Sequence, residues 1–174
     1  MRRTTILLSL IGSIALAAPL MSTACGAGSN RAGAAAVKPG NMPEMGSWDG
    51  VFFNPLWGFL HIKQEGTSIT GRWKRTDESA WGEMHGTVTG DVARFEWVEH
   101  KVGMIGAASI TKGRGYFRYT RPEGDNVDDH LIGEWGLNED EIGGGEWDAV
   151  KQRNMKPDLN SIKAETEPTV GGWK

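Results

Sequence analysis

The stretch WGEMHGTVTGDVARFEWVEH, residues 81–100, decides the fold of this 174-residue chain. Apolar residues alternate with polar ones on both sides of Gly90-Asp91, and this dipeptide is a signal for a tight β-hairpin. The alternation predicts two antiparallel strands, 81–89 and 92–100, each turning one face toward a shared apolar core.

Similar alternation recurs along the chain between glycine-rich turns. The other predicted strands are 48–54, 58–65, 69–74, one within 107–120, 130–136 and 145–150. Eight consecutive strands with short connections predict an all-β, antiparallel up-and-down meander. Closing a meander into a barrel removes both unpaired edges, and we therefore expect a closed eight-stranded barrel. The alternative is an open or sandwiched sheet with the same alternation.

A Gly-x-Trp triplet occurs on three of these predicted strands, at residues 71–73, 133–135 and 145–147. Glycine permits the local bend that a small, tightly curved barrel needs. The indole ring then occupies the space that the missing side chain leaves. The triplets therefore favour a closed barrel with a bulky aromatic interior, in a chain that contains eight tryptophans.

The span from Trp48 to Val150 resembles two groups of eight-stranded meanders with inward aromatic residues, the avidin-like and lipocalin-like barrels. Trp48-Asp49-Gly50 is similar to the Gly-x-Trp of both families, in altered order. The resemblance implies the barrel fold. It implies no ligand, because the biotin-contacting residues of avidins cannot be placed on this sequence.

The N-terminus has the layout of a secretory signal peptide, because Arg2 and Arg3 precede an apolar run over residues 6–21. The run is closed by Ser22-Thr23-Ala24-Cys25. This ending resembles the signal of bacterial lipoproteins, in which the cysteine is diacylated and becomes the new N-terminus. We therefore predict a signal peptide over residues 1–24 and a membrane anchor on Cys25, the only cysteine of the chain.

Two other fates of the signal stay open. Ser22 and Ala24 also form the small-x-small site of ordinary signal peptidase, whose cleavage would give a secreted or periplasmic chain with a free thiol. An uncleaved signal would itself hold the chain in the membrane. Under the lipoprotein interpretation the protein belongs to the cell envelope. Gly26, in place of an aspartate that would resemble an inner-membrane retention signal, favours the outer membrane.

Composition divides the remainder of the chain. Residues 25–46 are small and polar and predict a lipidated cysteine followed by a flexible linker. A barrel domain is expected at 47–150, and the polar residues 151–174 predict a flexible C-terminal tail. The net charge is −3, and removal of the signal peptide with its two arginines would make it more negative. We therefore expect no nucleic-acid partner.

No catalytic or cofactor motif stands out, since the sequence lacks the P-loop, His-Glu-x-x-His, Gly-x-Ser-x-Gly and Cys-x-x-Cys patterns. The histidines fall on four predicted strands; they are His61, His85, His100 and His130. They would form a metal site only if the strands gathered them. Because no pair has a ligand spacing such as His-x-His, we favour four solvated histidines and expect neither metal nor cofactor.

Carboxylates gather in two predicted loops, at residues 123–129 and 138–141. Calcium takes several oxygen ligands, so these loops are conceivable calcium sites. The Asp-x-Asp-x-Asp-Gly register is absent, however, and we favour solvated turns that keep the protein soluble.

Aromatic residues on the inward face are candidates for lining a ligand pocket. They are Trp73, Phe95, Trp97, Phe117, Tyr119, Trp135 and Trp147. Such rings would stack on a sugar, an aromatic metabolite or a lipid tail. The alternative, which we favour, is that they fill the small interior as core.

Trp57 and Phe59, beside the first turn, would form either a lid over the barrel mouth or an exposed contact site.

Three hypotheses of function follow. The preferred one is a non-catalytic, lipid-anchored barrel that binds a small apolar or aromatic ligand or an envelope partner. The second is a filled barrel with a structural or inhibitory role at the cell surface. The third is an enzyme whose polar groups, drawn from Glu99, Arg94 and Glu134, turn inward against the facing that the alternation predicts.

Overall fold

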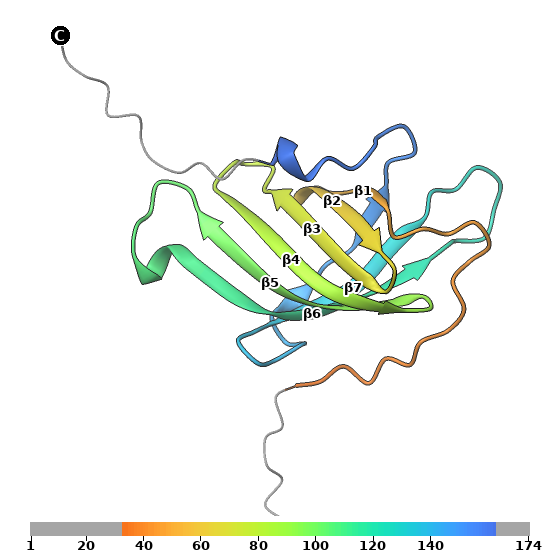
Figure 1. Cartoon of the computed structure of the whole chain (residues 1–174), viewed down its shortest axis with the longest axis horizontal. Helices are drawn as coiled ribbons and strands as arrows, with labels where there is room; N and C mark the ends of the chain where they lie inside the picture. Colours follow the sequence, from red (N-terminus) through yellow and green to blue (C-terminus); the bar gives the residue numbers. More distant parts are fainter. Residues whose placement is uncertain (1–32, 163–174) are drawn as a thin grey trace, which may run out of the picture.

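The computed structural model describes residues 33–162, and these form an all-β, closed antiparallel barrel (Figure 1). The strands are β1 (Gly50–Asn54), β2 (Gly58–Glu65), β3 (Ser68–Lys74), β4 (Ala80–Thr89), β5 (Val92–Lys101), β6 (Ile110–Thr120), β7 (His130–Leu137), β8 (Gly145–Glu146) and β9 (Ala149–Lys151). Two 3₁₀ turns, η1 (Ala107–Ser109) and η2 (Leu159–Ser161), are the helical elements of the described part. The predicted fold class is therefore confirmed.

The strands follow one another around the wall in chain order, and the end of the chain closes it. From β1 to β7, each strand pairs with the next one in the chain. β9 lies between β7 and β1 and pairs with both of them. The predicted eighth strand is split into β8 and β9, which lie on β7 in one continuous register. Trp147 lies between the two pieces, and its backbone N–H still donates to the carbonyl of Gly133 at 2.9 Å.

The barrel has two ends, which differ in their side chains. We call one the Trp57 end; it carries the connections 55–57, 75–79, 102–109 and 138–144. We call the other the Tyr119 end; it carries the turns 66–67, 90–91 and 121–129. In Figure 1 the β5–β6 hairpin extends from the Trp57 end.

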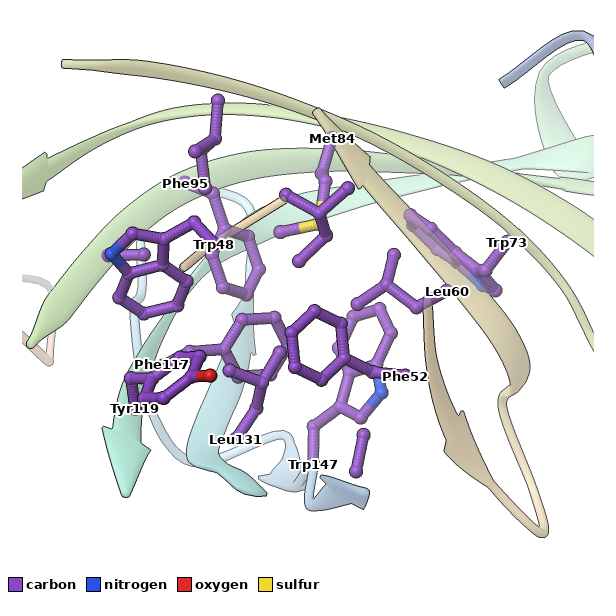
Figure 2. Packing of buried hydrophobic residues seen from close by; sticks show 14 of the residues in the cluster. Trp48, Phe52, Leu60, Trp73, Met84, Phe95, Phe117, Tyr119, Leu131 and Trp147 are labelled. Atoms are coloured by element: carbon purple, nitrogen blue, oxygen red, sulfur yellow. The ribbon is translucent and has the colours of Figure 1, made fainter. Parts of the chain in front are cut away.

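The inner face is packed with aromatic rings, as Figure 2 shows. Alternate residues of β5 illustrate the pattern: Ala93, Phe95 and Trp97 are buried, whereas Glu96 between them is exposed. Period-two alternation therefore places the apolar side chains inside a closed wall, as the sequence predicts.

Glycines of the wall receive the rings of the neighbouring strand. Trp73 lies opposite Gly82 in the β3–β4 register, and a Cβ added to Gly82 would come 2.1 Å from the Trp73 ring. Other inward rings face a cross-strand glycine in the same way: Phe95 faces Gly115, Trp97 faces Gly113, Phe117 faces Gly133 and Trp135 faces Gly145. The prediction placed each indole over the glycine of its own triplet; the structure places Trp73 and Trp135 over a glycine one strand away.

Part of the predicted linker is held against the barrel. Residues 33–46, which we call the strap, have no regular secondary structure but run along the outside of the wall (Figure 1). Gly33 donates its N–H to Asp140 at 2.6 Å, and the N–H of Gly40 donates to Asp91 at 2.5 Å. The flexible-linker prediction is therefore wrong for residues 33–46, while residues 25–32 lie outside the described part.

The predicted flexible tail is also packed where it is described. Lys151 belongs to β9, and the N–H of Gln152 donates to the carbonyl of Val51 at 2.8 Å. The chain then returns along the wall, where the N–H of Asp158 donates to Nδ1 of His61 at 3.0 Å and Ile162 is buried. Residues 163–174 lie outside the described part. Over residues 33–162, no helix is long and apolar enough to span a membrane.

The ring-over-glycine packing predicts a specific cost for adding one methyl group. Gly82→Ala should lower the free energy of unfolding by about 1–3 kcal/mol, because the new Cβ overlaps the Trp73 ring. In a Trp73→Phe background the same change should cost clearly less, since the overlapping atoms belong to the part of the indole that phenylalanine lacks. Urea unfolding of the four variants of this cycle measures the coupling. Equal costs in both backgrounds would contradict it.

Candidate functional site

The seven residues predicted to line a pocket do converge inside the barrel. Six of them are buried and Trp135 is partly buried against the same cluster. Trp147 is central: its ring centroid lies 5.0 Å from that of Trp73, 5.3 Å from that of Phe117 and 6.1 Å from that of Phe95. These separations are those of rings in direct contact.

The ring contacts favour the filled core over an internal ligand pocket. Three depressions of the described part, of about 460, 290 and 280 Å³, open on the surface, and none of the three is bordered by the seven aromatic residues. The indole N–H groups of Trp73 and Trp147 are buried without a hydrogen-bond partner among the described residues, so ring packing rather than hydrogen bonding places these side chains. Ligand binding by the seven stays a prediction.

Trp57 closes one end of this core. Its ring packs on Trp147 at a centroid distance of 4.8 Å and on Trp135 at 5.7 Å. The guanidinium of Arg75 lies over the Trp57 ring, 4.4 Å from the ring centroid. Of the two interpretations of this loop, the lid fits Trp57. Phe59 is 40 % exposed and packs on Phe53 outside the barrel.

A partly buried ion pair lies beside this lid. Arg75 donates two hydrogen bonds of 2.9 Å to the carboxylate of Glu99, which is 6 % exposed. Glu99 continues the inward row of β5, so the outward facing assigned to it from the sequence is wrong. The fork geometry satisfies both carboxylate oxygens, and it anchors Arg75 over Trp57. The pair therefore acts as a clamp on the lid.

The other two residues of the enzyme hypothesis lie on the outside of the wall. Arg94 forms an ion pair with Glu141 and donates to the strap carbonyls of Ala35 and Val37 at 3.0 and 3.2 Å. Glu134 accepts a hydrogen bond from the hydroxyl of Tyr116 at 3.4 Å. None of these contacts links Arg94 or Glu134 to Glu99, so the three residues do not form a single catalytic site.

The Tyr119 end carries a polar network. The hydroxyl of Tyr119 donates to Asp129 at 2.5 Å and accepts from the ammonium of Lys151 at 3.2 Å. Lys151 also donates to the carbonyl of Ser47 at 2.6 Å, and Arg121 donates to both oxygens of Asp129 at 2.6 and 3.0 Å. The network ties β6, β9 and the loop 121–129 together at the mouth of the barrel.

Burial sets the protonation of this network. It raises the pKa of the Tyr119 hydroxyl, and the hydrogen bond to Asp129 adds to the effect. Burial lowers the pKa of Lys151. Burial also opposes the charge of Asp129, but hydrogen bonds from Arg121 and Tyr119 outweigh it and hold the pKa of that carboxyl below its ordinary value. Tyr119 is thus a neutral donor to an ionised carboxylate.

The largest of the three depressions opens beside this network. Its volume is about 460 Å³. It is lined by Met45, Arg121, Gly124, Asn126, Val127, Asp129, Lys151 and Arg153. Three cations and one carboxylate line it, and Arg153 also forms an ion pair with Asp128 beside the lining, so the site has three cations against two carboxylates. The sequence analysis missed it, because two of the cations belong to the segment predicted to be a flexible tail.

One histidine and two carboxylates of the acidic loops are less solvated than predicted. His61 is 7 % exposed, and burial lowers its pKa, so the prediction of four solvated histidines is wrong for this one. In the acidic loops Glu141 is buried against Arg94 and Asp129 is engaged by Arg121, so these two carboxylates are not free turn residues. Within residues 33–162, no group of three or more His, Cys, Asp or Glu side chains is placed to hold a metal ion.

No protein-family model, curated protein or solved structure matches this chain. The strand order and pairing of the barrel are compatible with the avidin-like and lipocalin-like layout. Cys25 and the signal segment lie outside the described residues.

The lowered pKa of Asp129 predicts a pH-dependent contribution to stability. Its pKa is below the ordinary value of 3.8 in the folded chain, so the contribution is present above that pH and is lost as the pH falls through the folded pKa. Asp129→Asn should lower the free energy of unfolding by about 1–2 kcal/mol at neutral pH, and the difference should shrink below about pH 4.

Urea unfolding at several pH values measures this difference. Asp125→Asn, in the same loop and exposed, is the control and should change little at any pH. An Asp129→Asn effect that stays constant down to pH 2 would contradict the assignment.

Proposed function

We propose that this protein is a lipid-anchored, non-catalytic binding module of the bacterial cell envelope, held at the outer membrane through Cys25. One observation supports the binding role above the others: the depression of about 460 Å³ at the Tyr119 end is lined by three cations. The interior is filled by interlocking rings, so recognition falls to the outside of the barrel. The signal-like residues 1–24 and the following cysteine support the anchor.

The filled interior favours an envelope partner over a small apolar ligand. An apolar ligand would have to displace rings that already contact one another, at the cost of those contacts. The depression at the Tyr119 end offers an alternative with no such cost. Arg121, Lys151 and Arg153 at its edge suit an anionic group on the partner, such as the carboxylates of an acidic segment.

The filled barrel also fits a structural or inhibitory surface protein. The clamp of Arg75 on Glu99 and the packed lid of Trp57 support this second candidate, because both stiffen one end of the barrel. The two candidates differ in whether the Tyr119 end contacts another molecule.

The anchor is tested by acylation of the full chain in a bacterial host. The protein should incorporate labelled palmitate and fractionate with the outer membrane. Cys25→Ser should lose the label completely, since no other cysteine is present. Ser29→Ala, four residues further on, is a matched control that should keep it. An unlabelled wild-type chain, or a Cys25→Ser chain that is still labelled, would contradict the lipoprotein assignment.

The binding role is tested by photo-crosslinking in intact cells. A photoreactive amino acid at Asp125, an exposed residue of the loop beside the depression, should give one discrete adduct with an envelope component. The same group at Lys63, exposed on β2, is the control and should give none. Arg153→Gln should weaken the Asp125 adduct severalfold by removing one of the three cations. Equal adducts from both positions would favour the structural role instead.

A further inference from the structure

The β5–β6 hairpin ends in an exposed apolar tip. Residues 102–110, VGMIGAASI, contain no charged side chain, and we call them the apolar tip. Ile105 is 96 % exposed, and Met104 and Ile110 are each 48 % exposed. Single exposed apolar residues are ordinary on protein surfaces, but a contiguous group at a protruding point marks an interaction site (Figure 1).

The backbone of the tip is fixed by hydrogen bonds. The N–H of Ser109 donates to the carbonyl of Gly106 at 3.0 Å, and the Ser109 hydroxyl donates to the same oxygen at 2.6 Å. At the base, the N–H of Val102 donates to the carbonyl of Ser79 on the adjacent turn at 2.8 Å. Ile105 therefore lies directly before a hydrogen-bonded turn.

The tip lies at the barrel end where the strap begins. Gly33 is held by the loop 138–144 of the Trp57 end: it donates to Asp140 at 2.6 Å, and its carbonyl accepts from the N–H of Glu141 at 2.9 Å. The same loop joins the base of β6, because the N–H of Asn138 donates to the carbonyl of Lys112 at 3.0 Å. The start of the strap and the apolar tip therefore share one end of the molecule.

Chain length limits how far this end can be from the anchor. Eight peptide units separate Cys25 from Gly33. Whatever their conformation, they span at most about 28 Å. Acyl chains on Cys25 in a bilayer would thus hold the Trp57 end near the lipid surface, within reach of the protruding tip.

We propose that the apolar tip inserts into the surface of the bilayer that holds Cys25, and so fixes the orientation of the barrel. This inference rests on the lipid anchor of the proposed function. Met104 and Ile105 enter the boundary between head groups and acyl chains. Lys101 and Lys112, both exposed on the two strands that carry the tip, reach the lipid phosphates. The Tyr119 end, with its depression, then points away from the membrane and is free to meet a partner.

The test uses a fluorescent label whose emission rises in an apolar environment. The mature chain carries Cys25→Ser and an N-terminal hexahistidine tag, which holds it on phosphatidylcholine vesicles that contain a nickel-chelating lipid. A nitrobenzoxadiazole label is attached through Ile105→Cys, or through Lys63→Cys on the outer wall as the matched control. This arrangement tests the tip even if the natural chain is not acylated, so failure of the tip and failure of the anchor are distinguishable.

Insertion predicts about a twofold or larger rise in emission at position 105 on vesicle binding, because the label enters the lipid boundary. Quenching by nitroxide-labelled lipids should accompany the rise, and position 63 should change little. In the 105-labelled chain, Met104→Asp should abolish the rise while the tag keeps the protein on the vesicle. If the emission at position 105 does not rise although the protein is bound to the vesicles, the proposal is overturned. A label that responds only to an added envelope-protein fraction would also overturn it, and would identify the tip as a protein contact.

Discussion

An aromatic ring lying over a glycine of the next strand is the interaction on which this barrel depends. At each such pair the glycine leaves room for an indole or phenyl ring from the neighbouring strand. The wall is too tightly curved to hold two side chains at the same place on its inner face. Trp73 over Gly82 shows the fit, since even one added carbon at Gly82 overlaps the ring. Because the pairs follow one another around the wall from β3 to β8, the rings meet in the middle, and Trp147 joins them.

A core made in this way leaves the ends and the outer wall for recognition. The Trp57 end is sealed by a ring that a partly buried ion pair holds down, whereas the Tyr119 end is finished by hydrogen-bonded polar groups around a depression. Polar groups at a barrel mouth keep their charge only where partners compensate for burial. Arg121 and Tyr119 do this for Asp129, which is why its carboxyl stays ionised beside a buried hydroxyl.

The strap shows how a segment without regular secondary structure can still be ordered. Arginine and carboxylate groups on the wall bind its backbone: Arg118 donates to the carbonyl of Lys38 at 2.7 Å, and Asp91 accepts from Gly40 while it also pairs with Arg118. Charge-assisted hydrogen bonds to main-chain groups need no particular side chain on the strap. The same contacts determine where the chain arrives, and so which end of the barrel lies nearest to Cys25.

The sequence by itself determined the eight-stranded meander, the inward set of aromatic residues and the need for glycines among them, because alternation and turn chemistry are local properties of the chain. Only the tertiary structure decided which ring covers which glycine, since that depends on the register between strands. It also decided that the strap and the tail pack on the barrel and that Lys151 and Arg153 join the polar site. Backbone hydrogen bonds and ion pairs between distant residues have no periodicity that could be recognised in the sequence.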